Sequence, residues 1–148
     1  MDVDPVRSKI MRAVPRTDTT PERCVRQLAH SLGFRFRLHR RDLPGTPDIV
    51  FPRLSTVVFV HGCFWHRHPK CTKASTPRTR ALFWREKFKA NVGRDKRAIA
   101  RLSALGWRVS VIWECETLHP DRLERKLLRV LAPRAQCTQK RLSRSTRN

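Results

Sequence analysis

Acidic residues are scarce in this 148-residue chain. Twelve Asp and Glu stand against 33 Lys and Arg, which gives a formal net charge of +21. A chain with this excess of positive charge is expected to bind a polyanion such as nucleic acid. Because carboxylates are so few, each one that is buried or carried by a strand is a candidate functional group.

Long apolar runs are missing as well. No stretch reaches the ~18 apolar residues that a membrane-spanning helix needs. The N-terminal sequence MDVDPVRSKIMRAV carries two acids and lacks the apolar core of a signal peptide. We therefore expect a cytoplasmic protein, associated with the nucleoid when bound to DNA, with no membrane partner. Cysteines in such a compartment rarely form disulfides, which favours metal binding for Cys63, Cys71 and Cys115.

The apolar pattern predicts one α/β domain without internal repeats. Thr20 and Pro21 give a helix start, with the threonine as N-cap, and Gly33 ends the apolar stripe of that helix. At Gly106 a helix is followed directly by a strand, which is an α/β signature. The expected helices cover residues 21–32, 82–92, 94–105 and 121–131, and the expected strands cover 34–38, 48–51, 56–60 and 107–113. The turn at 52–55 joins the second and third strands as a hairpin or an adjacent pair.

The two ends of the chain differ from its middle. Residues 1–20 are basic and polar with a few apolar anchors, and they read as an arm that contacts DNA. Residues 133–148 are basic and nearly free of large apolar side chains, which is typical of a disordered tail that can add phosphate contacts. The globular domain is therefore expected to span residues 21–132.

The stretch from His61 to Cys71 reads HGCFWHRHPKC and combines three histidines with two cysteines. Cys63, His68 and Cys71 have the spacing of zinc ligands, and a fourth ligand must come from elsewhere. The best candidate is Cys115, because it follows the apolar run WRVSVIW that reads as a buried strand. Buried thiols and packed imidazoles are the alternative interpretation of these residues.

A second kind of chemistry is indicated by Asp48, which follows a turn and heads an apolar strand. Such a carboxylate can hold a hard cation at a sheet edge, although a capping role is the alternative. With Mg²⁺ held there, His61 and His66 are candidates to take a proton from water and to protonate the leaving oxygen of a phosphodiester. Glu22 could steady either imidazole, with a helix-dipole role as its alternative.

Six blocks of the sequence, in this order, closely resemble the very-short-patch-repair (Vsr) DNA mismatch endonucleases. The resemblance covers residues 5 to 132. It implies a restriction-endonuclease-like α/β core, with a mixed sheet flanked by helices, and a structural zinc. The blocks are RSKIMRAV (7–14), DTTPE (18–22), LPGTPDIVF (43–51), VFVHGCFWHRHPKC (58–71), FWREKFKANVGRD (83–95) and LGWRVSVIWEC (105–115).

The resemblance also implies an activity. Family members use Mg²⁺ to nick one strand of double-stranded DNA on the 5′ side of the thymine in a T·G mismatch, which arises when 5-methylcytosine deaminates. A lone mismatch has no two-fold symmetry, so a monomer is favoured. The alternatives are a restriction-type endonuclease of the same fold with another target, and a non-catalytic DNA-binding module that depends on zinc.

The resemblance assigns roles to matching positions. Aromatic side chains are implied to wedge into the base stack beside the mismatch, where a weakly stacked wobble pair makes insertion less costly. Core packing is the alternative for these rings, and phosphate contact or solvation is the alternative for the two polar readers of the mispaired bases. The implied roles are Asp48, with the Val60 backbone, for Mg²⁺; His61, His66 and Glu22 for catalysis; Cys63, His68, Cys71 and Cys115 for zinc; Phe64, Trp65 and Trp84 for the wedge; Met11 and Val14 for the arm; and Lys87 and Asn91 for base reading.

The chain departs from the family pattern at two places. Val60 stands where a threonine is expected, so only its backbone carbonyl can help to hold Mg²⁺. The zinc loop places two residues between His68 and Cys71 where the pattern has one, and Arg67 interrupts a run of histidines. A two-residue gap still suits tetrahedral zinc.

Overall fold

The strand β3 (Thr56–His61) forms the centre of a four-stranded mixed sheet in the computed structural model, which describes residues 18–133. All six residues of β3 are buried, as the β-branched and apolar sequence TVVFVH requires. The strand order is β1-β2-β3-β4, with β1 (Arg37–Leu38), β2 (Ile49–Phe51) and β3 antiparallel in sequence. The strand β4 (Arg108–Trp113) runs parallel to β3, so its last residue, Trp113, lies beside His61.

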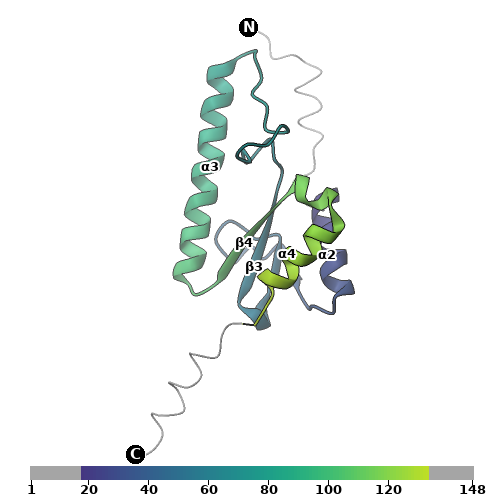
Figure 1. Cartoon of the computed structure of the whole chain (residues 1–148). Coiled ribbons are helices and arrows are strands. Elements are labelled where there is room, and N and C mark those ends of the chain that lie inside the picture. Colours follow the sequence, from purple (N-terminus) through teal and green to yellow (C-terminus); the bar gives the residue numbers. More distant parts are fainter. Residues whose placement is uncertain (1–17, 134–148) are drawn as a thin grey trace, which may run out of the picture.

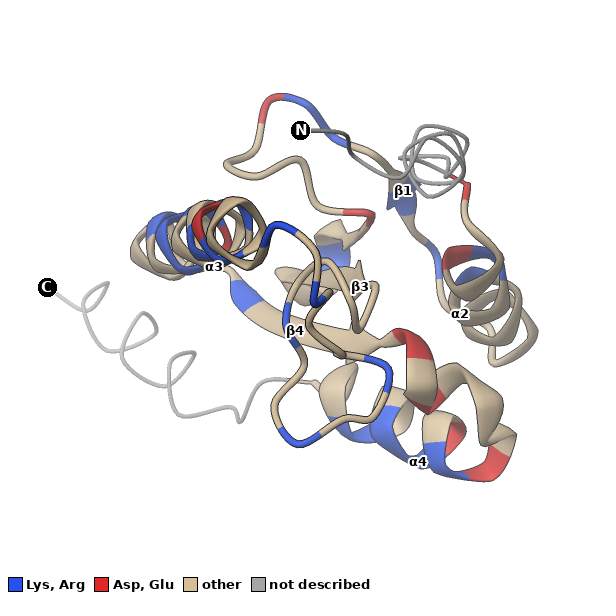
Figure 2. Cartoon of the chain, turned by 90° about the horizontal axis from the view of Figure 1, so that it is seen from above, with Lys and Arg blue, Asp and Glu red and all other residues tan. Residues whose placement is uncertain are grey.

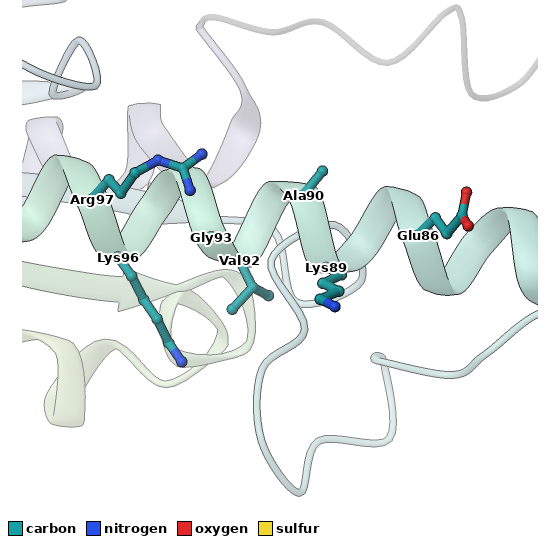
Figure 3. Close-up of a pocket in the computed structure, with 7 residues that line it drawn as sticks. All are labelled: Glu86, Lys89, Ala90, Val92, Gly93, Lys96 and Arg97. Atoms are coloured by element: carbon teal, nitrogen blue, oxygen red, sulfur yellow. The ribbon is translucent and has the colours of Figure 1, made fainter.

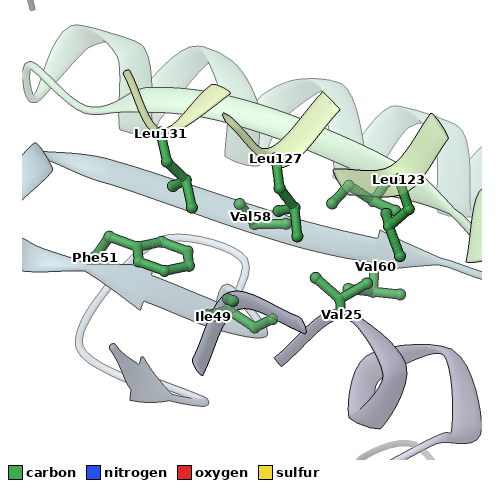
Figure 4. Packing of buried hydrophobic residues seen from close by; sticks show 10 residues of the cluster. Val25, Ile49, Phe51, Val58, Val60, Leu123, Leu127 and Leu131 are labelled. Carbon is green, nitrogen blue, oxygen red and sulfur yellow. The ribbon is translucent and has the colours of Figure 1, made fainter. Parts of the chain in front are cut away.

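Helices cover both faces of this sheet (Figure 1). Val58 and Val60 point to one face, where they pack against α2 (Thr20–Ser31) and α4 (Pro120–Val130) (Figure 4). Val57 and Phe59 point to the opposite face and pack against α3 (Ala81–Ala104). The mixed α/β class predicted from the sequence is therefore confirmed.

The predicted helices at the two ends of the domain are present. Thr19, one residue before the predicted cap, is the N-cap of α2, and its hydroxyl accepts a hydrogen bond from the Glu22 N–H at 3.3 Å. Pro120 begins α4 in place of the predicted start at 121. The hairpin between β2 and β3 is also confirmed, with a short 3-10 turn, η1 (Pro52–Leu54), joining the strands.

The prediction of two helices across residues 82–105 was wrong, because α3 is one continuous helix of 24 residues. Gly93 lies inside it, at a cost of about 1 kcal/mol relative to alanine. Before the glycine, buried Phe88 packs against Phe64 of the preceding loop, and after it Ala98 and Leu102 pack against the sheet. Tertiary packing therefore outweighs the local helix-breaking signal.

The predicted strand at 34–38 is shorter than expected. Only Arg37 and Leu38 pair with β2, while Phe34 and Phe36 pack edge-on against the ring of Phe51. These two side chains therefore pack against the core although their backbone lies outside a strand.

Charge is distributed unevenly over the described residues (Figure 2). The helix α3 carries seven Lys and Arg against two acids, whereas the segment from η2 (Glu114–Leu118) through α4 carries four of each. Of these two segments, α3 therefore carries the excess of positive charge, and the one from η2 through α4 is balanced. Within residues 18–133, no helix combines the length and apolar character that crossing a membrane requires.

The predicted N-terminal arm and C-terminal tail fall almost wholly outside the described residues. Met11 and Val14, assigned to the arm, lie outside them as well. The domain boundaries at 20 and 133 remain predictions.

Candidate active site and metal centre

The end of β3 and the loop that follows it supply two neighbouring clusters of chemically active side chains. His61 is the last residue of β3, and the chain then turns through residues 62–80 before α3 begins. Arg67 adopts a left-handed backbone conformation, with φ of 54°, between His66 and His68. The two histidines on either side of it belong to different clusters.

The first cluster contains Cys63, His68, Cys71 and Cys115. Their ligand atoms all lie within 4.8 Å of one another. The His68 Nδ1 lies 3.7 Å from the Cys63 Sγ and 3.4 Å from the Cys115 Sγ. The His68 ring stacks on Trp113, with centroids 4.3 Å apart, which fixes its orientation. The structure thus brings together the four residues that the sequence predicted as zinc ligands.

These distances fit a tetrahedral ion. With Zn–S and Zn–N bonds of about 2.3 and 2.0 Å, the sulfur–nitrogen edge of a tetrahedron is about 3.5 Å. Burial raises the pKa of Cys63 to about 12, and burial also raises the pKa of Cys115. A bound dication would stabilise both thiolates, so binding would release protons. The Cys71 thiol differs, since the backbone N–H of Lys73 lowers its pKa.

The second cluster is built around two stacked imidazoles. The rings of His61 and His66 lie 3.9 Å apart and nearly parallel, at 8°. The His66 Nδ1 lies 2.6 Å from the Asp95 Oδ2, which comes from α3. Burial and the neighbouring His66 lower the pKa of His61 to about 4, so that ring is neutral at pH 7. Because the His66 Nδ1 is bonded to Asp95, its Nε2 is the atom that can exchange a proton with a substrate or water.

Asp48 lies beside this pair, immediately before β2. Its Oδ2 accepts a hydrogen bond from the Val60 N–H at 2.7 Å, which ties the carboxylate to the end of β3. Burial raises the pKa of Asp48 to about 7, and the nearby Glu22 carboxylate adds to the rise. Among residues 18–133, no Lys or Arg forms an ion pair with Asp48. A half-buried carboxylate without a Lys or Arg partner is suited to bind a divalent cation.

The predicted partner of Glu22 was wrong. Its Oε2 lies 3.0 Å from the His39 Nε2 and accepts a further bond from the Asp18 N–H, in place of His61 or His66. The His39 backbone N–H in turn donates to the Asp48 carbonyl at 3.2 Å. Glu22 therefore supports the site from the side of Asp48, through His39.

Aromatic rings gather between the loop and the start of α3. Phe64 contacts Trp65, Trp84 and Phe88 edge-on, with ring centroids 5.2 to 6.0 Å apart. Trp84 is buried, at 6% exposure, and its ring stacks on Phe88. In the free protein the core-packing alternative thus holds for Trp84, whereas Phe64 and Trp65 are partly exposed.

The two predicted base readers both contact this aromatic cluster. The Lys87 Nζ lies 5.5 Å from the Trp65 ring centroid and 5.8 Å from that of Trp84. The Asn91 side-chain amide donates to the Trp65 carbonyl at 3.4 Å. Lys87 and Asn91 therefore extend from α3 to contact the partly exposed Trp65.

Sequence reasoning missed Asp95 and His39. Asp95 was visible as one of only two acids in α3, and the scarcity of carboxylates was the signal that could have found it. It lies 29 residues from His66, and only the packing of α3 against the loop brings the two together. His39 gave no signal, because it lies in a basic stretch outside any regular element.

An open groove also lies on the side of α3 away from these clusters. It contains none of the cluster residues, and its three cationic side chains suit phosphate contacts better than a reaction. The groove is lined by Glu86, Lys89, Ala90, Val92, Gly93, Lys96 and Arg97 (Figure 3).

Comparisons with known proteins identify the family of this chain. Residues 2–73 match the family described as DNA mismatch endonuclease Vsr. The chain is 51% identical over 127 residues to the type II nicking enzyme V.XorIIP of Xanthomonas oryzae pv. oryzae, covering 86% of this chain and 93% of the relative. It is 45% identical over 117 residues to the DNA mismatch endonuclease Vsr of Escherichia coli, covering 79% of this chain and 74% of the relative.

A third relative, the type II nicking enzyme V.NmeAIP of Neisseria meningitidis, is 41% identical over 110 residues, covering 74% of this chain and 78% of the relative. These relatives, together with the site formed by Asp48, His61 and His66, define the protein as a DNA endonuclease. The chain belongs to the Vsr family of DNA mismatch endonucleases, as its sequence blocks predicted.

Proposed function

We propose that this protein uses Mg²⁺ to nick one strand of duplex DNA on the 5′ side of the thymine in a T·G mismatch, and that this initiates very short patch repair. The observation that carries the proposal is the convergence of Asp48, His61 and His66 at the end of β3, beside a partly exposed aromatic pair. Membership in a family of mismatch endonucleases supports it, and also supports a restriction-endonuclease-like core. The protein is proposed to act as a monomer, because a lone mismatch has no two-fold symmetry.

Asp48 would hold the magnesium ion, with the carbonyl of Val60 as a second oxygen donor. The Val60 N–H already bonds to one Asp48 oxygen, so the other oxygen is free to bind a cation. Bound Mg²⁺ would polarise the phosphodiester and make a water easier to ionise. His39 donates its backbone N–H to the Asp48 carbonyl, and Glu22, which bonds to the His39 ring, adds negative charge nearby that favours a dication there.

His66 is the proposed base. Its Nδ1 bonds to the Asp95 carboxylate, which orients the ring and stabilises the charge that the imidazole gains. In this tautomer Nδ1 carries the hydrogen and Nε2 takes the proton from the attacking water. His66 is also partly exposed, so substrate can reach it.

His61 is the proposed partner at the leaving oxygen. Its pKa of about 4 keeps it neutral in the free protein, where its remaining N–H can donate a hydrogen bond. A bound phosphate raises the proton affinity of a neighbouring imidazole, because opposite charges attract. His61 thus becomes a proton donor only once DNA is bound, which restricts the chemistry to the complex.

Phe64 and Trp65 are proposed to enter the base stack at the mismatch, with Trp84 beneath them. Each stacking contact is worth about 1 to 3 kcal/mol. A wobble pair gives up less stacking than a matched pair, so insertion favours the mismatch. Lys87 and Asn91, which border Trp65, are placed to reach the mispaired bases, and Met11 and Val14 are assigned to the opposite groove by the family resemblance alone.

A panel of strand-labelled duplexes tests the proposal. Duplexes with a T·G pair, with other mismatches and with only matched pairs are incubated with the zinc-loaded protein and Mg²⁺. We expect a single nick 5′ to the thymine of the T·G duplex and little cutting elsewhere. Equal cutting of matched duplexes, or cuts in both strands, would instead support a restriction-type endonuclease, and binding without cutting would support a zinc-dependent binding module.

A further inference from the structure

Arg67 makes an unusually complete set of contacts within the loop that carries both clusters. Its Nη1 donates to the carbonyls of Phe64 and Ser75, at 3.3 and 3.1 Å. Its Nη2 donates to the Ala74 carbonyl at 2.7 Å and to the Thr76 hydroxyl at 2.9 Å. One guanidinium thus joins the base of the aromatic pair to a segment that follows the last cysteine of the loop.

The same guanidinium also reaches α3. Its Cζ lies 4.1 Å from the ring centroid of Phe88 and 5.9 Å from that of Phe64. A planar, delocalised cation can stack on a ring while it donates in its own plane, which a lysine ammonium cannot do. Arg67 therefore connects three parts of the molecule: the aromatic pair, residues 74–76 and the helix that carries Asp95.

The backbone of Arg67 supports a directed role for the side chain. Its φ of 54° is in the left-handed region, which is strained for a residue with a Cβ and is natural for glycine. This turn sends His66 toward Asp95 and His68 toward the cysteines. A residue held in a strained conformation persists where the contacts of its side chain outweigh the strain.

We propose that Arg67 is a positioning residue for mismatch recognition: by clamping the Phe64 carbonyl, residues 74–76 and the Phe88 ring, it holds Phe64 and Trp65 ready to enter the base stack. This inference rests on the proposed function, because it assumes that the two rings insert at the mismatch. Arg67 touches neither zinc ligands nor proton-transfer atoms through its guanidinium, so its loss affects recognition before chemistry.

Two substitutions separate the clamp from the backbone. Arg67→Lys keeps the charge and loses both the paired Nη1 and Nη2 donors and the stacking on Phe88. Arg67→Gly relaxes the left-handed backbone and removes the clamp altogether. Arg78→Lys is the matched control, because Arg78 is exposed in the same loop.

Three quantities are measured on each zinc-loaded variant. They are the ratio of Kd for matched and T·G duplexes, the single-turnover nicking rate at saturating T·G duplex, and the fluorescence of 2-aminopurine placed beside the mismatch, which reports unstacking. Zinc content and the melting temperature are recorded alongside.

We expect both Arg67 variants to lose about tenfold in the Kd ratio, equivalent to a contact of ordinary strength. The 2-aminopurine signal should fall with it, while the saturating rate stays within about threefold, as expected when binding and not the chemical step is changed. Zinc content should match the Arg78→Lys control, and Arg67→Gly should melt no lower than Arg67→Lys.

Two results would overturn the inference. The first is an unchanged Kd ratio and 2-aminopurine signal in both variants. The second is a loss of zinc in parallel with the loss of discrimination, which would make Arg67 a purely structural residue. Failure of the proposed function has a different signature, because the unsubstituted protein would then show no preference for the T·G duplex in the first place.

Discussion

The two clusters at the end of β3 share one stretch of chain, residues 61–71, and are completed by different elements, η2 for one and α3 for the other; they also differ in their donor groups and exposure. In the cysteine cluster, three thiols and an imidazole lie within 4.8 Å of one another and supply the four ligands of a tetrahedral ion. In the histidine–carboxylate cluster, Asp48 and His61 have strongly shifted pKa values and His66 is partly exposed. Closed soft-donor sites are typical of structural zinc, and open sites with shifted pKa values are typical of catalysis.

The comparison teaches that the loop alternates its residues between holding the fold and doing chemistry. Cys63 and His68 face the cysteines, while His61 and His66 face Asp95 and Asp48. Disrupting the first cluster should therefore remove the second, whereas disrupting the second should leave the first intact.

The largest effect is expected from Cys115→Ser. This residue joins η2 to the loop, so its loss removes one zinc ligand and should leave residues 63–71 disordered. Zinc content should fall, and both mismatch binding and nicking should drop more than about a hundredfold, because structural zinc contributes folding energy directly. Cys24→Ser is the control, since Cys24 lies outside the cluster. Retained nicking in a zinc-free Cys115→Ser protein would contradict the account.

Asp48→Ala and His66→Ala should separate cutting from binding. Each removes a proposed catalytic group without touching the cysteine cluster, so nicking should fall by about 10² to 10⁴, the usual contribution of such a group. Zinc content and the Kd for T·G duplex should change little. The measurement is single-turnover nicking beside a binding titration in Ca²⁺, and an equal loss of both would argue that the clusters are not independent.

Asp95→Asn should have a smaller effect of the same kind. The amide keeps the shape of the side chain and loses the charge that orients and supports His66, so nicking should fall by about 10- to 100-fold. The pH dependence of the rate should shift as well, which a purely structural change would not cause. Glu86→Gln, on the groove of the same helix, should leave both unchanged.

Asp48 also makes a prediction about stability. Its pKa is about 7 in the folded protein against 3.8 ordinarily, so between those values the folded state binds more protons than the unfolded state. The stability that this group contributes therefore decreases as pH rises through that window. Asp48→Asn removes the effect, so without Mg²⁺ the variant should melt higher than the parent at pH 8 and nearly equally at pH 4. A lower melting temperature at pH 8 would contradict the assignment of Asp48 as a half-buried carboxylate without an ion pair.

The smallest effect is expected from Val60→Thr, which restores the residue of the family pattern. The Val60 side chain packs with Val25 and Leu123 on the face opposite α3, so a hydroxyl there meets apolar side chains. Nicking should stay within about threefold of the parent, while unfolding becomes easier by about 1 kcal/mol, as expected for a buried hydroxyl. A large gain in nicking would show that a side-chain oxygen at this position matters.

Local patterns predicted most of the fold and part of the site. The two helices α2 and α4, the β2–β3 hairpin and the four zinc-type ligands followed from periodicity, caps and ligand spacing. The continuity of α3 across Gly93 did not, because it depends on packing against the sheet. The partners Asp95 for His66 and His39 for Glu22 were missed for the same reason, since contacts across 29 and 17 residues arise only when the elements pack.

The central claim is that zinc holds the loop and magnesium supports the cutting. The most direct test is to dialyse zinc-loaded protein free of Mg²⁺ and measure nicking of a strand-labelled T·G duplex, before and after Mg²⁺ is added. The account predicts mismatch binding without nicking in zinc alone, and a single nick 5′ to the thymine once Mg²⁺ is present. Full nicking in zinc alone, unchanged by Mg²⁺, would contradict it.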